Sequence, residues 1–463
     1  MKKSKILLFA GAAALFGHFG YAATPDQAAQ LKTTLTPMGG ERAGSADGYV
    51  PAWTGGDTTL PAGYQEGDII PNNYGNDQPI FTVTPANEAQ YASMLTPGQL
   101  AMLKQYGGDG FVMKVYPAHR TAAAPQWVYD DTYENATSTK IDPQGIIAGF
   151  TNAYGGPPFP IPDNDANAGA EIIWNHLLKW SGVYIKSLNS TIVVSADGQS
   201  VVAGTPEVTE DNLFYNPGGS AATMPDYFQK SRLNFVAPAD MVGEQFLTWF
   251  SIRPSVSPNQ TWIYLAGQGR VRKAPSTTYD TPSGQTNDVN NYDEFGQFGG
   301  AMDRYDWKLI GKAEIIVPYN NYSIFHQPVS SVVGPHFLNP NMVRWEIHRV
   351  WIVDATLAPG KRHIEPHRRF YVDEDSWNIL MAESWDAKGN FWKYSTALLD
   401  DRPDVPAVVA VGYTACYNLQ TGEYVYSAPD YSAGKSGPNP FQVLQTVSNT
   451  TFEPQTMAAQ SRY

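Results

Sequence analysis

Apolar and polar positions alternate along most of the chain after Val183, and this period of two predicts β-strands. Both faces of the stretch 345–353 carry bulky side chains, so we expect one face to meet a covering layer or a bound ligand. Turn residues at 386–389 separate two such stretches and predict a hairpin. Successive strands joined by short turns favour an antiparallel meander. The clearest predicted strands are 261–265, 345–353, 369–373, 377–385 and 390–395.

The first third of the chain predicts helices and irregular segments instead. The stretch 39–74 is rich in Gly, Pro, Asp and Asn and is typical of an irregular extended segment. Farther on, the breaker-rich stretch 155–165 precedes an amphipathic helix predicted over 171–180. Three helix starts are predicted where a threonine N-cap precedes a proline: Thr24-Pro25, Thr84-Pro85 and Thr96-Pro97.

The composition supports a folded, β-rich protein. Of the 463 residues, 42% are hydrophobic, 13% are aromatic and only 16% are charged, which is too little charge for a disordered or coiled-coil protein. The formal net charge of −13 disfavours contact with phosphate backbones or anionic lipid surfaces. We therefore expect no nucleic-acid partner.

The first 22 residues have the features of a secretory signal peptide. Three lysines precede a short apolar run, and the small residues Gly20 and Ala22 stand at the expected cleavage point. The apolar run is shorter than the ~20 residues of a membrane span, and no later stretch reaches that length. The only cysteine, Cys416, lies far from the cleavage point, which excludes lipid attachment there and an intramolecular disulfide. We expect an exported, non-lipidated periplasmic protein that does not span the membrane.

Five longer blocks of the sequence are distinctive: GGERAGSADGYVPAWTGG (39–56), YPAHRTAAAPQWVYD (116–130), EIIWNHLLKWSG (171–182), WEIHRVWIVDATLAPGKRH (345–363) and RRFYVDEDSW (368–377). Together they resemble one protein family, a large group of proteobacterial periplasmic proteins of unassigned function that are described as outer-membrane lipoprotein-sorting-like. The resemblance spans nearly the whole mature chain.

The resemblance implies a fold similar to the LolA- and LolB-type carriers of the Lol pathway. That fold is α+β and mainly antiparallel: an incomplete, half-open β-barrel with covering helices, here preceded by an irregular N-terminal third. Such folds hold acyl chains or similar apolar ligands in the concave face. Family members also occur alongside transporters of the resistance-nodulation-division type, which implies an inner-membrane exporter or an outer-membrane acceptor as partner.

On this interpretation the chain forms one compact domain with four parts. The signal peptide, 1–22, is followed by a helix-and-loop region, 23–160, that serves as a lid or an arm. The antiparallel half-barrel covers 161–430, and a C-terminal tail covers 431–463.

Large aromatic side chains and arginines are the candidate ligand contacts. The aromatic side chains would line a cavity for an apolar ligand, with ordinary sheet core as the alternative. Arginines at the mouth of such a cavity would bind an anionic head group, with structural ion pairs as the alternative. The predicted lining residues are Trp345, Trp351, Tyr371, Trp377, Trp385 and Trp392. The predicted head-group residues are Arg270, Arg272, Arg349, Arg368 and Arg369.

Other candidate chemistry is weaker, and we predict no catalytic residue, no metal and no cofactor. The motif His363-Ile364-Glu365-Pro366-His367 places three metal-ligating residue types at alternate positions, but four basic residues surround it. Residues 163–167 depart from the spacing of a calcium loop, and 434–436 lack the first glycine of a phosphate-binding loop. Cys416 lies in an apolar run, where a reactive thiol is unsupported.

The leading hypothesis is a non-enzymatic periplasmic carrier for a hydrophobic or amphipathic, lipid-like molecule, and it predicts a cavity beside the sheet. A carbohydrate-active or glycan-binding protein is the alternative, and it predicts an exposed aromatic groove with a carboxylate pair. A third hypothesis, an envelope assembly factor without a small ligand, predicts an exposed apolar patch in place of a cavity.

Overall fold

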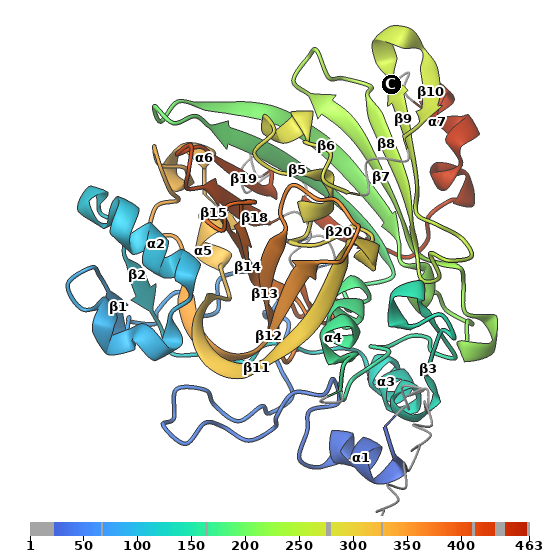
Figure 1. Ribbon diagram of the computed structural model, residues 1–463, viewed down its shortest axis with the longest axis horizontal. Coiled ribbons are helices and arrows are strands. Elements are labelled where there is room, and N and C mark those ends of the chain that lie inside the picture. Colours follow the sequence, from blue (N-terminus) through green and yellow to red (C-terminus); the bar gives the residue numbers. More distant parts are fainter. Residues whose placement is uncertain are drawn as a thin grey trace, which may run out of the picture.

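The computed structural model describes residues 23–65, 68–162, 165–274, 279–325, 327–409, 413–430 and 440–460. The predicted signal peptide lies outside the described residues. Within them, sixteen strands form one curved sheet, and the strands at its two ends do not pair with each other (Figure 1). The predicted half-open, mainly antiparallel barrel with a few covering helices is therefore confirmed.

The strands of the large sheet come from almost the whole length of the chain. They are β1 (Phe81–Val83), β2 (Met113–Val115), β5 (Tyr184–Val194), β6 (Ser200–Asp211), β7 (Tyr227–Ala237), β8 (Gln245–Ser251), β9 (Gln260–Leu265), β10 (Arg270–Lys273), β11 (Tyr305–Pro318), β12 (Trp345–Leu357), β13 (His367–Asp373), β14 (Ile379–Trp385), β15 (Phe391–Ala397), β18 (Thr414–Asn418), β19 (Tyr424–Pro429) and β20 (Phe441–Leu444). Two small sheets pair β3 (Lys140–Ile141) with β4 (Phe150–Thr151) and β16 (Asp400–Arg402) with β17 (Ala407–Val409).

Neighbouring strands follow the order β1-β2-β12-β13-β14-β15-β18-β19-β5-β6-β7-β8-β9-β10, with β11 added to β12 and β20 added to β5. Every described pair is antiparallel except the single parallel contact of Trp345 with Val115. The predicted strands at 261–265, 345–353, 369–373, 377–385 and 390–395 correspond to β9, β12, β13, β14 and β15. The basic run after β9 becomes the edge strand β10.

The helices are short, and two of them begin directly after an N-cap threonine that forms a capping box. Thr24 and Thr96 each form the predicted capping box, with Gln27 and Gln99 respectively. At Thr84-Pro85 no α-helix begins, because the side chain of Asn87 accepts a hydrogen bond from the Thr84 amide at 2.7 Å and closes a turn. The helices are α1 (Pro25–Ala29), α2 (Pro97–Tyr106), α3 (Gln126–Ser138), α4 (Ala168–Leu177), α5 (Tyr322–Phe325), α6 (Val329–Val332) and α7 (Met457–Gln460).

The N-terminal third packs against the half of the sheet formed by β11 to β15, which we call the filled half. Trp377 Nε1 donates a hydrogen bond to the Met38 carbonyl at 2.9 Å, and Gln99 Nε2 donates one to the Ile316 carbonyl at 2.7 Å. The Gly98 amide on α2 donates to a carboxylate oxygen of Glu383 at 2.6 Å. Most buried apolar side chains, from the N-terminal third and from the sheet, join one continuous core.

The sheet crosses the domain divisions expected from the sequence. Strands β1 and β2 come from the region 23–160, and β20 comes from the region 431–463. The C-terminal residues also cover one face of β7 to β9, where Trp249 Nε1 donates to the Phe452 carbonyl at 3.1 Å and Gln245 Nε2 to the Met457 carbonyl at 3.0 Å. Among the described residues, no helix has the length and hydropathy needed to cross a membrane.

Candidate functional site

A cavity of about 260 Å³ lies beside the strands β5 to β9, which we call the hollow half of the sheet. Its walls come from these strands, from β18 and β19, from the end of α4 and from the segment 285–299. The apolar lining residues are Leu177, Pro206, Val208, Phe228, Leu233, Phe246, Phe250, Tyr292, Phe295 and Phe298. Polar lining residues include Lys179, Asn189, Thr191, Glu210, Ser231, Thr248, Thr261, Glu294, Thr414 and Ser427.

The strand register arranges the sheet wall in rows across neighbouring strands. One row is polar: Glu210 pairs with Ser231, Ser231 with Thr248, and Thr248 with Thr261. The next row toward the far end is apolar and joins Val208, Leu233 and Phe246. Residues two apart along a strand share a face, so both rows face the cavity.

A second polar row closes the far end of the cavity. Thr414 pairs with Ser427, and Ser427 pairs with Thr191, whose hydroxyl lies 3.1 Å from the Ser427 hydroxyl. On β5, Thr191 lies six residues beyond Ile185, which pairs with Glu210. At about 3.3 Å per residue, the two polar rows are roughly 20 Å apart. The wall is therefore polar at both ends and apolar between them.

The segment 285–299 covers the cavity opposite the sheet. The Tyr292 and Phe246 rings lie 6.1 Å apart, so this roof touches the apolar row. The adjacent acids anchor the roof to the filled half: Lys393 Nζ lies 2.9 Å from a carboxylate oxygen of Glu294, and Arg368 Nη1 donates to Asp293 at 2.8 Å. Burial raises the pKa of Glu294, and neighbouring Glu365 adds to this effect while Lys393 opposes it.

A lysine and a glutamate meet at the α4 end of the cavity. Burial lowers the pKa of Lys179 to about 8, with Glu210 opposing the shift. Burial also raises the pKa of Glu210, against the effects of Ser231 and Lys179. Lys179 Nζ donates to the His176 carbonyl at 3.2 Å, and Ser231 Oγ donates to Glu210 Oε1 at 3.2 Å.

The six aromatic residues predicted to line a cavity lie on or beside β12 to β15, and none of them borders the cavity of the hollow half. Their observed contacts are with protein groups. Trp345 borders only a narrow gap of about 10 Å³, and Trp351 stacks parallel to Trp377 with 6.5 Å between ring centroids. Tyr371 donates to Glu383 at 3.0 Å, Trp385 stacks on His367 at 4.3 Å, and Lys393 Nζ lies 4.8 Å from the Trp392 ring centroid. A ligand contact at these six positions stays a prediction.

The five arginines are also spread over separate places, and none borders the cavity. Arg270 and Arg272 are exposed on the edge strand β10. Arg349 pairs with Glu314 at 2.9 Å, Arg368 pairs with Asp293, and Arg369 binds both oxygens of Asp354 at 2.6 and 2.9 Å. Three of the five thus form the ion pairs that the sequence offered as the alternative, and a head-group role stays a prediction.

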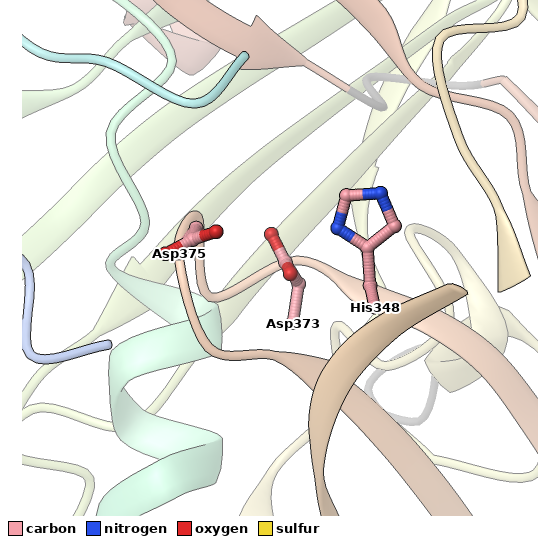
Figure 2. A group of neighbouring side chains, drawn as sticks. All are labelled: His348, Asp373 and Asp375. Carbon is pink, nitrogen blue, oxygen red and sulfur yellow. The ribbon is translucent and has the colours of Figure 1, made fainter. Parts of the chain in front are cut away.

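His348, Asp373 and Asp375 form a buried cluster in the filled half, where they lie side by side (Figure 2). One potential ligand atom from each lies within 4.8 Å of the others. Both Asp375 oxygens, however, accept hydrogen bonds from Arg120 at 2.6 and 2.7 Å, and His348 Nε2 lies 2.9 Å from Glu346. The guanidinium occupies the place of a cation, so these residues fit a structural polar network better than a metal centre.

The remaining candidate motifs are placed apart or outside the described residues. His363 contacts Asp293 at 3.0 Å, Glu365 contacts Lys393 at 3.0 Å, and His367 contacts Asp354 at 3.4 Å, so the three alternate side chains face different partners. Cys416 is buried, and burial raises the pKa of its thiol. Residues 163–164 of the calcium-like loop and all of 434–436 lie outside the described part of the chain.

The sequence analysis did not identify the residues that border the cavity. The sequence feature that could have identified them is a small polar residue among large apolar ones within a strand, such as Thr248 in Phe246-Leu247-Thr248-Trp249-Phe250. Alternation alone does not distinguish which polar residues share a row, because that depends on pairing between strands.

The chain matches one family model and is similar to several known proteins. The family model "Protein of unknown function (DUF1329)" matches residues 82–458. An uncharacterized protein of Pseudomonas aeruginosa is 38% identical over 433 residues, which is 92% of each chain. Two solved structures each cover 64% of this chain and 100% of their own, with 15% identity and a TM-score of 0.43. One is described as an outer membrane lipoprotein-sorting protein domain from Vibrio parahaemolyticus, and the other is a DUF1329 family protein from Desulfovibrio piger.

Proposed function

This chain belongs to the DUF1329 family, and we propose that it is a periplasmic binding protein, or carrier, for an amphipathic lipid-like molecule held in the cavity of the hollow half. The observation that carries the proposal is the cavity of about 260 Å³ between the sheet and the segment 285–299. Its size lies near the lower end of the roughly 300–1,000 Å³ of small-molecule sites, and its lining is apolar with convergent polar groups, as such sites require.

The energetics suit reversible binding of a chain-like molecule. Each buried CH₂ group contributes about 0.8 kcal/mol, so a body of ten carbons contributes about 8 kcal/mol before costs. Immobilising the ligand costs an estimated 4 kcal/mol or more. The remainder is about 4 kcal/mol or less, which corresponds to a dissociation constant of about 1 mM or weaker for the apolar body alone. Polar contacts of the ligand must therefore supply the rest of the affinity. We place the protein in the periplasm on its predicted signal peptide, with an envelope exporter or an outer-membrane acceptor as partner.

Mass spectrometry of an organic extract tests the proposal. Protein is purified without detergent from the native periplasm, and a stoichiometric lipid-like species is the expected result. If the extract is empty, binding of 1-N-phenylnaphthylamine to the protein is measured next. This probe is uncharged and apolar, and its fluorescence rises on burial. A protein with neither cargo nor probe uptake would contradict the proposal and favour the glycan-binding or assembly hypotheses.

A cavity-filling substitution assigns the binding to this cavity. Leu233 is in the middle of the apolar row, and Val236 lies on the same strand but is 45% exposed. Leu233→Trp places an indole in the ligand space and is expected to lower probe affinity at least tenfold. Val236→Trp is the matched control and should leave affinity unchanged. Equal probe binding by both variants would place the binding site elsewhere.

A further inference from the structure

The α4 end of the cavity holds two ionisable groups that lack an ion-pair partner. Lys179 and Glu210 both border the cavity, and neither forms an ion pair with another described side chain. In the same part of the sheet, Lys186 and Glu207 do pair, at 2.9 Å, on the exposed face.

Both side chains have more hydrogen-bonding groups than their protein partners use. An ammonium group has three N–H donors, and Lys179 uses one of them on the His176 carbonyl at 3.2 Å. A carboxylate has two acceptor oxygens, and Glu210 receives one hydrogen bond, from Ser231 Oγ on Oε1. Each group therefore retains hydrogen-bonding capacity where it borders the cavity, and leaving that capacity unused in a buried site is costly.

The charges around the cavity define which ligand group fits. Besides the phenol of Tyr292, three ionisable side chains border it: Lys179, Glu210 and Glu294. Glu294 is already paired with Lys393, so the remaining pair is one cation and one anion. An anionic ligand would face Glu210, and a cationic one would face Lys179. A neutral group that accepts from the ammonium and donates to the carboxylate satisfies both without adding a charge to a buried site.

We propose that the ligand carries a neutral group that both donates and accepts hydrogen bonds, such as a hydroxyl or a primary amide, and that Lys179 and Glu210 bind this group at the α4 end of the cavity. The inference rests on the proposed function and names its ligand class. The apolar body of the ligand then lies along Val208, Leu233 and Phe246, and the hydroxyls of Ser231 and Thr248 adjoin its head. The lowered pKa of Lys179 and the raised pKa of Glu210 agree with a pair that is not in direct contact.

The test compares ligands of one chain length. Bound 1-N-phenylnaphthylamine is displaced with 1-dodecanol, dodecanamide, dodecanoate and dodecyltrimethylammonium, below their aggregation thresholds. The expected result is that the alcohol and the amide displace the probe about tenfold better than either charged ligand, which is the effect of one well-placed hydrogen bond to a charged group. Equal displacement by all four would overturn the inference.

Variants then assign the preference to the two residues. Lys179→Met and Glu210→Gln keep nearly the same shape and are expected to lose the tenfold preference, with the displacement by each ligand measured against the variant's own probe affinity. Lys186→Met and Glu207→Gln, from the exposed pair, are the matched controls and should retain it. A preference that survives in Lys179→Met and Glu210→Gln would contradict the inference even if the protein is a carrier.

The two proposals fail in distinguishable ways. If the natural protein takes up no probe and carries no cargo, the binding function itself is contradicted, and the head-group assignment with it. If the probe binds but all four ligands compete equally, the carrier function stands and only the assignment of Lys179 and Glu210 fails. If either variant lacks the circular-dichroism spectrum of the natural protein, the comparison of the four ligands on the natural protein still decides.

Discussion

The filled half and the hollow half belong to one sheet but use its faces differently. In the filled half, β12 has buried residues on both faces from Trp345 to Val350, and the N-terminal third packs against it. In the hollow half, small hydroxyl residues such as Ser231 and Thr248, which are paired on neighbouring strands, face the cavity. The indole rings of the filled half occupy the space that they face, whereas the serine and threonine side chains between the phenylalanines of the hollow half leave room. Six of the twelve tryptophans lie on or beside β11 to β15, and none of the twelve borders the cavity.

The two halves also differ in the ion pairing of their buried charged side chains. In the filled half, several buried charges are paired within the protein, as Arg120 is with Asp375 and Glu374. The hollow half leaves Lys179 and Glu210 without ion-pair partners among the described residues. A fully paired network stabilises a fixed structure, while unpaired groups at a cavity are available to a ligand. The comparison predicts that substitutions in the two halves will affect different measurements.

The largest expected effect is the loss of stability on replacing Arg120. Its guanidinium binds both oxygens of Asp375 and donates to the Glu41 carbonyl at 2.7 Å, all in a buried setting. Arg120→Met leaves the buried Asp375 carboxylate without its ion-pair partner and should lower the free energy of unfolding by about 3–5 kcal/mol. Urea unfolding followed by tryptophan fluorescence measures the change. Lys186→Met, which breaks an exposed pair, is the control and should cost less than about 1 kcal/mol.

A loss below about 1 kcal/mol for Arg120→Met would contradict the assignment of a tightly packed charge network to the filled half. Probe binding by the variant, measured while it is still folded, should match that of the natural protein, because Arg120 does not border the cavity.

A smaller effect is expected from enlarging a side chain in each half. Ala355 on β12 is fully buried in the main core, so Ala355→Phe overpacks it and should cost about 1–3 kcal/mol or more. Leu233→Trp enters the cavity and should change stability by less than about 1 kcal/mol while it blocks the probe. Thermal unfolding and probe titration on both variants give the two readouts. A destabilisation of similar size in both variants would mean that the hollow half has no usable space.

The smallest effect is a pH dependence that comes from Lys179. Burial lowers its pKa in the folded protein to about 8, against about 10.4 for an unfolded lysine. Between these values the folded state binds fewer protons than the unfolded state, so this lysine makes stability rise as the pH increases from about 8 to about 10. Below pH 8 both states are protonated, and the cost of burying the charge is constant.

Urea unfolding of the natural protein and of Lys179→Met at pH 7.5 and pH 10 isolates this contribution. Relative to the variant, the natural protein should gain on the order of 1 kcal/mol at the higher pH, since contact with solvent in the cavity reduces the full effect. The same comparison with Lys186→Met, whose lysine is exposed, should show no such gain. A difference between the natural protein and Lys179→Met that stays constant with pH would contradict a desolvated lysine.

Sequence reasoning predicted the strands and the hairpin because these depend on alternation and turn residues within short stretches, whereas the open barrel was implied by the resemblance to the family. It predicted α4 nearly in place for the same reason: residues 171–180 were expected and Ala168–Leu177 are helical. It missed the strand β10, because a stretch of four residues with three basic side chains and a single apolar one, Val271, is too short and too polar to indicate a strand. It also expected a helix at Thr84, where the Asn87 side chain closes a turn instead.

The cavity could not be predicted because it depends on contacts between distant segments. Glu210, Ser231, Thr248 and Thr261 become one row only through the register of four strands, and Lys179 joins them from the end of α4. Whether the aromatic residues of β12 to β15 face a ligand or a covering layer depends on the N-terminal third, such as Met38 against Trp377. No local sequence pattern indicates which half of the sheet the N-terminal third covers.

The path of the chain between β10 and β11 has a mechanical consequence. Strand β10 is at one end of the sheet and β11 lies on β12 at its other side, and the roof 285–299 belongs to the stretch of chain between them. The polypeptide itself therefore connects two margins that no hydrogen-bonded ladder joins among the described residues. On the proposed carrier function, the cover of the cavity is part of this connection, and its movement is linked through the chain to the margins of the barrel.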